Sequence, residues 1–240
     1  MPKVAIVTLT RFTDIFADLA KSVERYEPGR ETIVVTSGEA GNEVTCKGPS
    51  GPPRLRGWRA VEGVEPFVFS RNANLGIAAA GDMDVLLTND DVTLAEPMID
   101  GLRNLSKTLP NVGVIAPTVI GGVGTIQQHA GRVKGEAFRS YRHLCFVCVY
   151  IPRKALNLVG PMDEQFHGYG GDDVDYCWRI RQAGLFLYIA PEFRVRHGHG
   201  DRSYSSSFLR VMDEQNRMCE MRAMDDILKR KWNGLARSIA

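Results

Sequence analysis

The sequence lacks the features that mark secreted, membrane-spanning and strongly polyanion-binding proteins. Its longest apolar runs, such as VAIV and FVCVYI, are far shorter than the roughly 20 residues of a membrane-spanning helix. The amino terminus, MPKVAIVTLT, reads as a strand and shows no apolar signal segment followed by a cleavage site. A formal net charge of +2 over 240 residues indicates no particular polyanionic partner. We therefore expect a cytoplasmic protein, with peripheral association with a membrane as an open alternative.

Cysteine is scarce and odd in number. The chain has five cysteines, and free thiols are expected in a protein that stays inside the cell. Cys145 and Cys148 have C-x-x-C spacing within LCFVCVYI, which we predict to be a buried strand. Because positions three apart on a strand face opposite sides, a metal or redox site at this pair is the less favoured interpretation.

The pattern of apolar runs predicts a single α/β domain over residues 1–240. Hydrophobic residues make up 44% and charged residues 24%, as in an ordinary globular protein. Short apolar runs alternate with amphipathic helical segments in the first half, which predicts a parallel sheet covered on both faces. The predicted strands are residues 4–9, 32–37, 67–70, 84–91 and 112–117. This first half, residues 1–117, reads as a nucleotide-binding layer.

Two stretches interrupt the alternation. Residues 38–65 are rich in Gly and Pro and carry a basic cluster around Trp58, and a loop of this length is usually functional or mobile. Residues 118–143 carry glycines and polar residues at hairpin spacing, which predicts a β-excursion. A further strand, LFLYIA, and a long terminal helix from about Ser206 to Lys231 complete the expected order.

The stretch HGYGGDDVDYCWRIRQAG, residues 167–184, places three aspartates between a glycine loop and a predicted helix. Asp172 is a natural N-cap, and Asp175 can act as the acidic partner of a capping arrangement. Asp173 is left at the first helical position, where the helix N-terminus favours its negative charge. An ionised carboxylate beside a flexible loop is a candidate general base. Capping and catalysis both stay open on this stretch alone.

A second acidic group, Asn89-Asp90-Asp91, ends the predicted strand at residues 84–91. In an open parallel sheet, ligands bind beyond the carboxyl ends of the strands. An acid pair at this place is suited to holding a divalent metal against a diphosphate. The alternative is a simple turn, because Asn and Asp both favour turns.

Two histidines and one arginine are further candidates. His197 and His199 would share one face of a strand, as a chelating pair must, and imidazoles suit Mn or Zn better than Mg. Arg71, at the end of the predicted third strand, could clamp a phosphate bidentately. The alternatives are solvated histidines in a loop and a surface salt bridge for the arginine.

Each of these motifs has a structural alternative, but their order along the chain favours a functional site. The order is Arg71, then the acidic strand end, then the glycine loop with its aspartates, then His-x-His. In this order the sequence resembles the family-2 glycosyltransferases with the GT-A fold, and it shares features with the β-1,4-galactosyltransferases. The resemblance covers nearly the whole chain. The matching segments are FSRNANLGIAAAGDMDVLLTNDDVTL, IQQHAGRVKG, LVGPMDEQFHGYGGDDVDYCWRIRQAG, RVRHGHGDRSY and KRKWNG.

The resemblance implies an α/β fold with a mixed, mainly parallel sheet, a nucleotide-sugar-binding half at 1–117 and an acceptor and catalytic half at 118–240. Asp173 matches the catalytic base, and Asp172 beside it would contact the acceptor. Asp91 matches a metal ligand, with His197, His199 or both completing the metal shell. The remaining candidates are assigned to the donor site: Thr8, Thr10, Arg71, Asn74, Asn89, Asp90, Gly170 and Gly171.

The implied reaction is an inverting transfer of a sugar from a nucleotide-diphospho-sugar to an acceptor hydroxyl. A carboxylate takes the proton of the hydroxyl, and a divalent metal, Mn²⁺ with Mg²⁺ as the alternative, neutralises the departing diphosphate. Such a reaction needs a base on one side of the sugar and a metal on the other. This requirement agrees with two acidic centres on different chain segments.

The sequence departs from the family pattern after the second strand. An acid that reads the nucleotide base is usual there, whereas this strand runs into Thr36-Ser37-Gly38-Glu39. The donor nucleotide and its sugar therefore stay open. The acceptor is equally open among a glycan, a lipid-linked sugar, a protein and a modified nucleic acid.

Two other functions compete with a transferase. A sugar-phosphate nucleotidyltransferase would have a Gly-rich phosphate loop after the first strand, but this chain has TLTRFTD there. A non-catalytic sugar- or nucleic-acid-binding module would fit the basic loop around Trp58 and the basic run at residues 229–231. Retention of Asp173, Asp91 and His197 argues against a module that has lost its catalytic residues.

Overall fold

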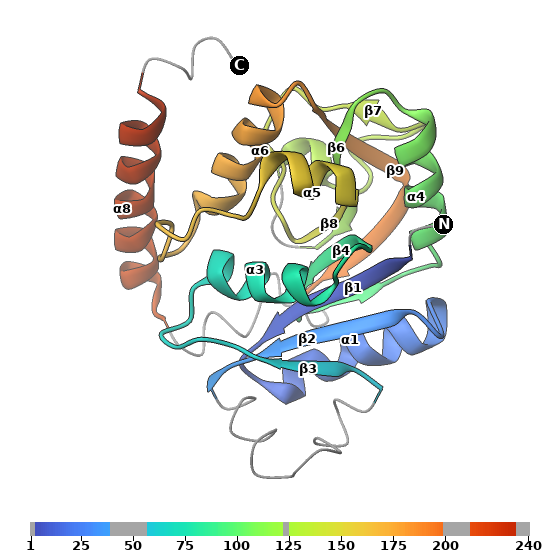
Figure 1. The fold of residues 1–240 in the computed structure, drawn as a ribbon, viewed down its shortest axis with the longest axis horizontal. Helices are drawn as coiled ribbons and strands as arrows, with labels where there is room; N and C mark the ends of the chain where they lie inside the picture. Colours follow the sequence, from blue (N-terminus) through green and yellow to red (C-terminus); the bar gives the residue numbers. More distant parts are fainter. Residues whose placement is uncertain (1–2, 39–56, 122–124, 199–211, 234–240) are drawn as a thin grey trace.

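The computed structural model describes residues 3–38, 57–121, 125–198 and 212–233. These residues form one mixed sheet of nine strands, in the order β3-β2-β1-β4-β8-β6-β9-β5, with β7 paired to β9 (Figure 1). The strands are β1 (Val4–Thr10), β2 (Glu31–Thr36), β3 (Arg59–Glu62), β4 (Asp84–Asn89), β5 (Val92–Leu94), β6 (Val112–Ile120), β7 (Phe138–Arg139), β8 (Cys148–Ile151) and β9 (Phe186–His197).

Helices cover both faces of the sheet because its central strands are apolar on both sides. The helices are α1 (Thr13–Tyr26), α3 (Phe69–Ala79), α4 (Ile99–Thr108), α5 (Arg153–Val159), α6 (Asp172–Gln182) and α8 (Glu214–Trp232). Ala5 and Val7 of β1 pack in one core cluster with α3, α5 and α6, and Val4 and Ile6 pack in another with α1 and α4. This alternation confirms the predicted doubly covered sheet.

The sheet is parallel over β1, β2, β3 and β4, as predicted for the first half. It becomes mixed at β8, which runs antiparallel to both β4 and β6. β8 comes from the second half of the chain and lies between two strands of the first half, so a single sheet contains both halves. The expected mixed, mainly parallel α/β architecture is therefore confirmed.

The prediction of a strand at residues 67–70 is wrong. α3 begins at Phe69, and the strand at this edge is β3, which lies inside the predicted loop at 38–65. The buried positions of α3, Ser70, Ala73 and Gly76, recur at helical spacing. A Cβ at Gly76 would lie 2.4 Å from Val7 Cγ1, so the close contact between helix and sheet requires glycine here.

The structure differs from the prediction at several further elements. The β-excursion at 118–143 contains a short 3-10 helix at Ile126–Gln128 and β7, while β5 and α5 were not predicted. α8 begins at Glu214 rather than near Ser206, because the Asp213 side chain accepts from the backbone N–H of Asn216 at 2.8 Å and caps the helix. Residues 206–211 lie outside the described residues.

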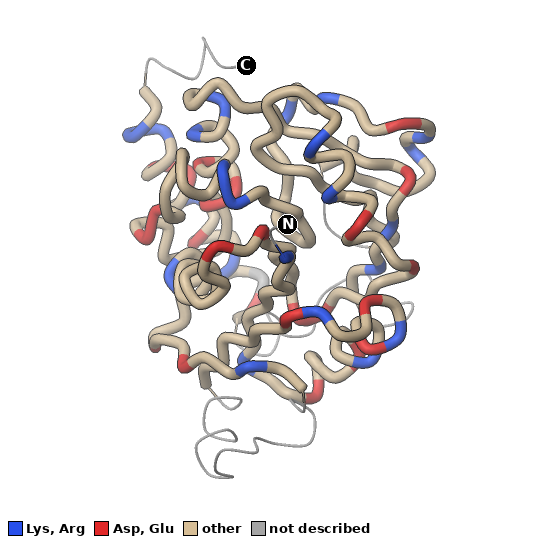
Figure 2. The backbone as a smooth tube through the Cα atoms, turned by 45° about the vertical axis from the view of Figure 1, so that its right-hand side comes forward, with Lys and Arg blue, Asp and Glu red and all other residues tan. Residues whose placement is uncertain are grey.

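Basic and acidic residues are interspersed along the described backbone (Figure 2). Among the described helices, none combines the length and apolar character that crossing a bilayer requires.

Candidate active site

The acidic strand end forms a buried turn between β4 and β5, at the edge where the parallel strands β1, β2 and β4 have their carboxyl ends. Thr10, the last residue of β1, donates its hydroxyl to Asp90 Oδ2 at 2.8 Å. Burial and the neighbouring charge of Asp91 raise the pKa of Asp90 to about 8. Thr8 lies two positions earlier on the same face of β1, and its buried hydroxyl has no hydrogen-bond partner among the described residues. The sheet thus brings three of the predicted donor-site residues to one edge.

Asp91 and His197 meet because β5 pairs antiparallel with the end of β9. The pairing sets Val92 opposite His197, and the backbone N–H of Gly198 donates to the Asp91 carbonyl at 2.9 Å. His197 Nε2 then lies 3.2 Å from Asp91 Oδ1, with side chains only 5% and 2% exposed. The structure therefore places these two predicted residues next to each other, although 106 positions of sequence separate them.

This pair fits two ligands of one divalent metal ion. His197 Nε2 is buried without a hydrogen-bond partner in the described part of the chain. Two ligand atoms held about 2.1 Å from one ion are roughly 3 Å apart when they occupy adjacent coordination positions. The described residues contain no group of three His, Cys, Asp or Glu side chains arranged for a metal, so the pair supplies part of a shell. His199 lies outside the described residues.

The glycine loop turns sharply into α6. Gly170 and Gly171 have φ angles of 89° and 85°, in the left-handed region that favours glycine. Gly171 occupies the N-cap position and so provides no side-chain cap hydrogen bond, while the backbone N–H of Val174 donates to Asp173 Oδ1 at 2.7 Å. The prediction that Asp172 caps the helix is therefore wrong, because α6 already begins at Asp172. Asp175 does not cap either: its buried carboxylate accepts from Arg179 and Trp232.

Asp172 and Asp173 are left as two partly exposed carboxylates at the start of α6. Burial, and next the charge of Asp173, raise the pKa of Asp172 to about 7. Burial also raises the pKa of Asp173, against the opposing effects of the positive charge of His143 and of backbone N–H groups. The helix N-terminus therefore does not alone set the charge of Asp173. A carboxylate with a raised pKa has the basicity that proton transfer near neutral pH requires.

Residues 145–147 join the acidic turn to Asp173. The backbone N–H of Asn89 donates to the Val147 carbonyl at 2.9 Å. The backbone N–H of Phe146 and the thiol of Cys145 lie against the Asp173 carboxylate. Asn89 of the acidic turn and Asp173 of α6 thus contact the same short backbone segment.

Gln128 fixes this segment in place. Its side chain is fully buried, accepts from the Cys145 N–H at 2.8 Å and donates to the Cys145 carbonyl at 3.0 Å. Cys145 precedes β8 rather than lying within the strand, which corrects its predicted position. Burial, and next the charge of Asp173, raise the pKa of the Cys145 thiol to about 12, so the thiol is protonated at neutral pH. The described cysteines are all free thiols.

Arg71 and Asn74 have their polar contacts with the segment at residues 162–164 rather than with the acidic turn. Arg71 Nε lies 3.4 Å from Glu164 Oε2. The Asn74 side chain donates to the Met162 carbonyl at 3.0 Å and accepts from the Met162 N–H at 2.8 Å. Both residues therefore hold the chain that leads into the glycine loop.

Three residues at the site were not predicted as part of it: Cys145 contacts Asp173, Gln128 contacts Cys145, and Trp232 contacts Asp175. The spacing of Thr125 and Gln128 is that of a capping box, and both hydrogen bonds of the box are present. That spacing was a usable signal for an ordered turn before Gln128. Contacts made by Cys145 and Trp232 depend on tertiary packing and leave no comparable pattern in the sequence.

No family model matches the sequence. The chain is 24% identical over 199 residues to the uncharacterized protein y4gI of Sinorhizobium fredii, a match that covers 72% of this chain and 21% of that protein. It is similar in structure to GalNAc-T7, solved with UDP, GalNAc and Mn²⁺, with a TM-score of 0.67, 15% identity, and coverage of 95% of this chain and 50% of that one.

The mannosyltransferase PcManGT of Pyrobaculum calidifontis, solved with GDP-Man and Mn²⁺, is a second structural neighbour. Its TM-score is 0.59 at 18% identity, and the match covers 85% of this chain and 59% of that one. The chain therefore spans about a fifth of the length of y4gI, half of GalNAc-T7 and 59% of the mannosyltransferase. These similarities confirm the expected GT-A fold.

Proposed function

We propose that this chain is a metal-dependent glycosyltransferase that moves a sugar from a nucleotide-diphospho-sugar to an acceptor hydroxyl. The observation that carries the proposal is the presence of a buried Asp91–His197 pair and of a carboxylate of raised pKa, Asp173. Asn89 of the acidic turn and Asp173 both contact residues 145–147. The GT-A fold supports it, because two neighbours with this fold contain Mn²⁺ and a nucleotide or nucleotide-sugar.

In this proposal Asp91 and His197 hold a divalent metal ion, and His199 is a further candidate ligand. The imidazole of His197 favours Mn²⁺ over Mg²⁺, which prefers oxygen ligands throughout. When bound, the ion supplies positive charge for the departing diphosphate as a Lewis acid. Asp90 is assigned to the donor because Thr10 and the turn hold it beside Asp91, and Asn89 and Thr8 are assigned to the donor from the same edge of the sheet.

Asp173 is proposed as the general base, with Asp172 contacting the acceptor. The acceptor hydroxyl gives its proton to Asp173 while its oxygen forms a bond to the anomeric carbon. The bond between that carbon and the diphosphate oxygen breaks, and the nucleoside diphosphate leaves with the electron pair. Attack from the face opposite the leaving group inverts the anomeric configuration.

The remaining candidate residues are assigned to the donor site through the glycine loop. No atom lies within 4 Å of a Cβ built at Gly170, so its missing side chain leaves room for a sugar to approach the start of α6. Gly171 instead makes room for Phe166 and Met224 and is proposed to act by shaping the loop. Arg71 and Asn74 are proposed to act on the donor side through their contacts with residues 162–164, which lead into that loop.

Thermal unfolding with nucleotides tests the donor site directly. A ligand that binds only the folded chain raises the Tm by mass action. We expect one of UDP, dTDP, GDP and CMP to raise the Tm in the presence of Mn²⁺ and to do so much less without it. His197→Ala should keep the fold and lose the Mn²⁺-dependent part of the shift. A panel in which no nucleotide shifts the Tm with Mn²⁺ present would contradict the proposal and favour a binding module.

A further inference from the structure

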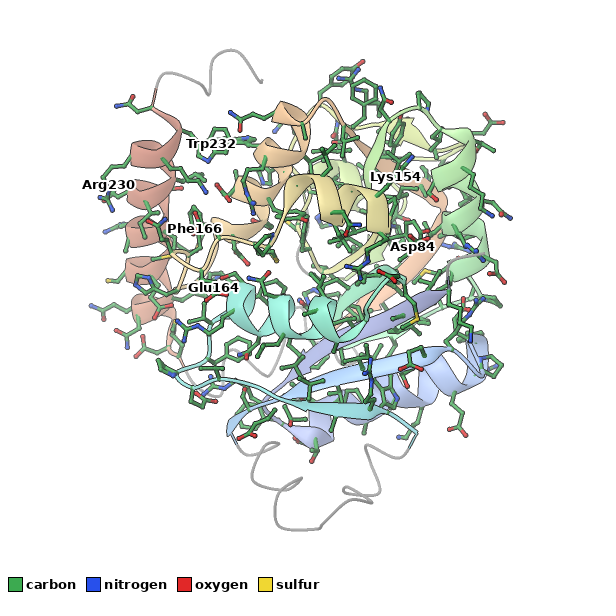
Figure 3. The ribbon with its side chains drawn as sticks, in the orientation of Figure 1. Asp84, Lys154, Glu164, Phe166, Arg230 and Trp232 are labelled. Atoms are coloured by element: carbon green, nitrogen blue, oxygen red, sulfur yellow. The ribbon has the colours of Figure 1, made fainter. Side chains whose placement is uncertain are left out.

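Helix α8 lies alongside the glycine loop and the start of α6, although the chain that connects it to β9 is long (Figure 1). Figure 3 shows Trp232 of α8 and Phe166 of the loop in the space between the two helices. Phe166, Met224, Leu228 and Trp232 form a small buried cluster separate from the two clusters of the sheet. α8 is therefore attached to the fold through the segment that carries Asp172 and Asp173.

The firmest attachment is at Asp175, in the first turn of α6. Its carboxylate is fully buried and accepts from Arg179 Nε at 3.0 Å, from Lys231 Nζ at 2.8 Å and from Trp232 Nε1 at 2.8 Å. A buried carboxylate requires such partners because its charge has lost its hydration. Two of the three donors come from α8, so α8 fixes the turn in which Asp173 lies two positions earlier.

α8 also contacts the glycine loop itself. The backbone N–H of Gly168 donates to Met224 Sδ at 3.2 Å, and a Cβ at Gly171 would lie 3.3 Å from Met224 Cβ. The guanidinium of Arg217 lies 5.5 Å from the ring centroid of Tyr169. The helix therefore contacts the loop at Gly168, at Tyr169 and at the second of its two left-handed glycines.

We propose that α8 is a brace that positions the Asp172–Asp173 turn, with Trp232 and Lys231 as positioning residues. This inference rests on the proposed function. A loop with two left-handed glycines and a helix start without a side-chain cap have little rigidity of their own. A general base must be held within about 0.5 Å of its working position. The contacts of α8 with Asp175 and the glycine loop provide that restraint from outside.

Two substitutions remove a polar contact with Asp175 and keep most of the apolar packing of α8, so they test whether the polar contacts position the turn. Trp232→Phe removes the indole N–H that binds Asp175 and keeps an aromatic ring against Trp178, whose ring centroid lies 5.2 Å away. Lys231→Met removes the ammonium group and keeps most of the aliphatic stem, whereas Lys231→Arg keeps a cationic donor. Val23→Ala is the matched control, because Val23 is buried in α1 on the other face of the sheet.

Amide hydrogen exchange measures how often the glycine loop and the start of α6 open, and this measurement does not depend on enzymatic activity. We expect faster exchange of the amides at residues 168–174 in Trp232→Phe and Lys231→Met, with unchanged exchange in β4, because the start of α6 opens locally. Lys231→Arg should exchange at the rate of the unaltered protein. Unchanged exchange at residues 168–174 in Trp232→Phe and Lys231→Met would overturn the brace, whatever the activity of the protein.

Kinetics then test the effect on the base. Nucleoside diphosphate release from the donor sugar that the unaltered protein uses should show kcat reduced about tenfold to a hundredfold in Trp232→Phe, since misplacement by about 1 Å costs this much. The donor KM should change less than twofold, and Val23→Ala should keep both constants. A kcat for Trp232→Phe within twofold of the unaltered protein would overturn the positioning role. Faster exchange in the variants, together with no release by the unaltered protein, would support the brace and contradict the proposed function alone.

Discussion

Removal of the Asp172 charge should move the pH dependence of transfer to lower pH. Asp172 and Asp173 are adjacent at the start of α6, and each raises the cost of ionising the other. A base works only when deprotonated, so activity is lost as the pH falls through its raised pKa. We therefore expect the acid limb of kcat/KM of the unaltered protein above pH 4, because burial raises the pKa of Asp173 and the neighbouring Asp172 has a pKa of about 7.

The size of the shift follows from the charge that Asp172→Asn removes. At an effective dielectric constant of about 20, two charges roughly 6 Å apart repel by about 3 kcal/mol. This energy corresponds to about two pKa units if both carboxylates are fully charged. Because both side chains are partly exposed, solvent screens this repulsion, and we expect a shift of about one unit.

The assay is nucleoside diphosphate release measured at low donor concentration from about pH 5 to about pH 9, which reports the free enzyme. Asp82→Asn is the matched control, because Asp82 is an exposed aspartate that precedes β4 at the opposite end from the acidic turn. It should leave the acid limb in place. An acid limb that stays fixed in Asp172→Asn, or that moves to higher pH, would refute the assignment of this pair as the titrating base.

Two further predictions concern the supports of the site. Gly171→Ala should lower stability by about 1–3 kcal/mol in chemical denaturation, because the new Cβ has φ near 85° and lies 2.9 Å from Phe166 Cδ1. Gly29→Ala, at φ 74° with no atom within 4 Å of the new Cβ, should lower stability less. Equal losses of stability in the two variants would show that the contact with Phe166 adds nothing to the cost of the positive φ. Gln128→Ala should lower the free energy of unfolding by about 1–3 kcal/mol, because both polar groups of the partly buried Cys145 backbone lose a partner. A loss below about 0.5 kcal/mol would contradict the role given to Gln128.

The sequence predicted the elements that strong periodicity defines. β1 was expected at 4–9 and ends at Thr10, and α1 shows the apolar stripe of Ile15, Leu19 and Val23 as buried positions. The run at residues 67–70 was misassigned, because a short apolar run cannot distinguish a strand from the first turn of a helix. β3 escaped prediction because it is an edge strand with three exposed residues out of four.

The site was predictable as a set of residues and not as an arrangement. The sequence marked Asp91 and His197 separately, but their contact depends on the pairing of β9 with the three-residue β5. The capping role expected of Asp172 failed because Gly171, with positive φ, occupies the cap position. Asp175 matched a capping pattern, yet its partner Trp232 lies 57 residues away, beyond the reach of local sequence reasoning.

The measurement that tests the proposed function most directly compares Asp173→Asn with the unaltered protein in both transfer and donor binding. The diphosphate that stabilises the unaltered protein with Mn²⁺ is identified first, and release of that diphosphate from its nucleotide-sugars is then measured. We predict that Asp173→Asn loses release by at least about a hundredfold, as expected for removal of a general base, and keeps the Mn²⁺-dependent rise in Tm. Retention of release, or joint loss of release and of the Tm rise, would contradict Asp173 as the base and make it a structural residue of α6.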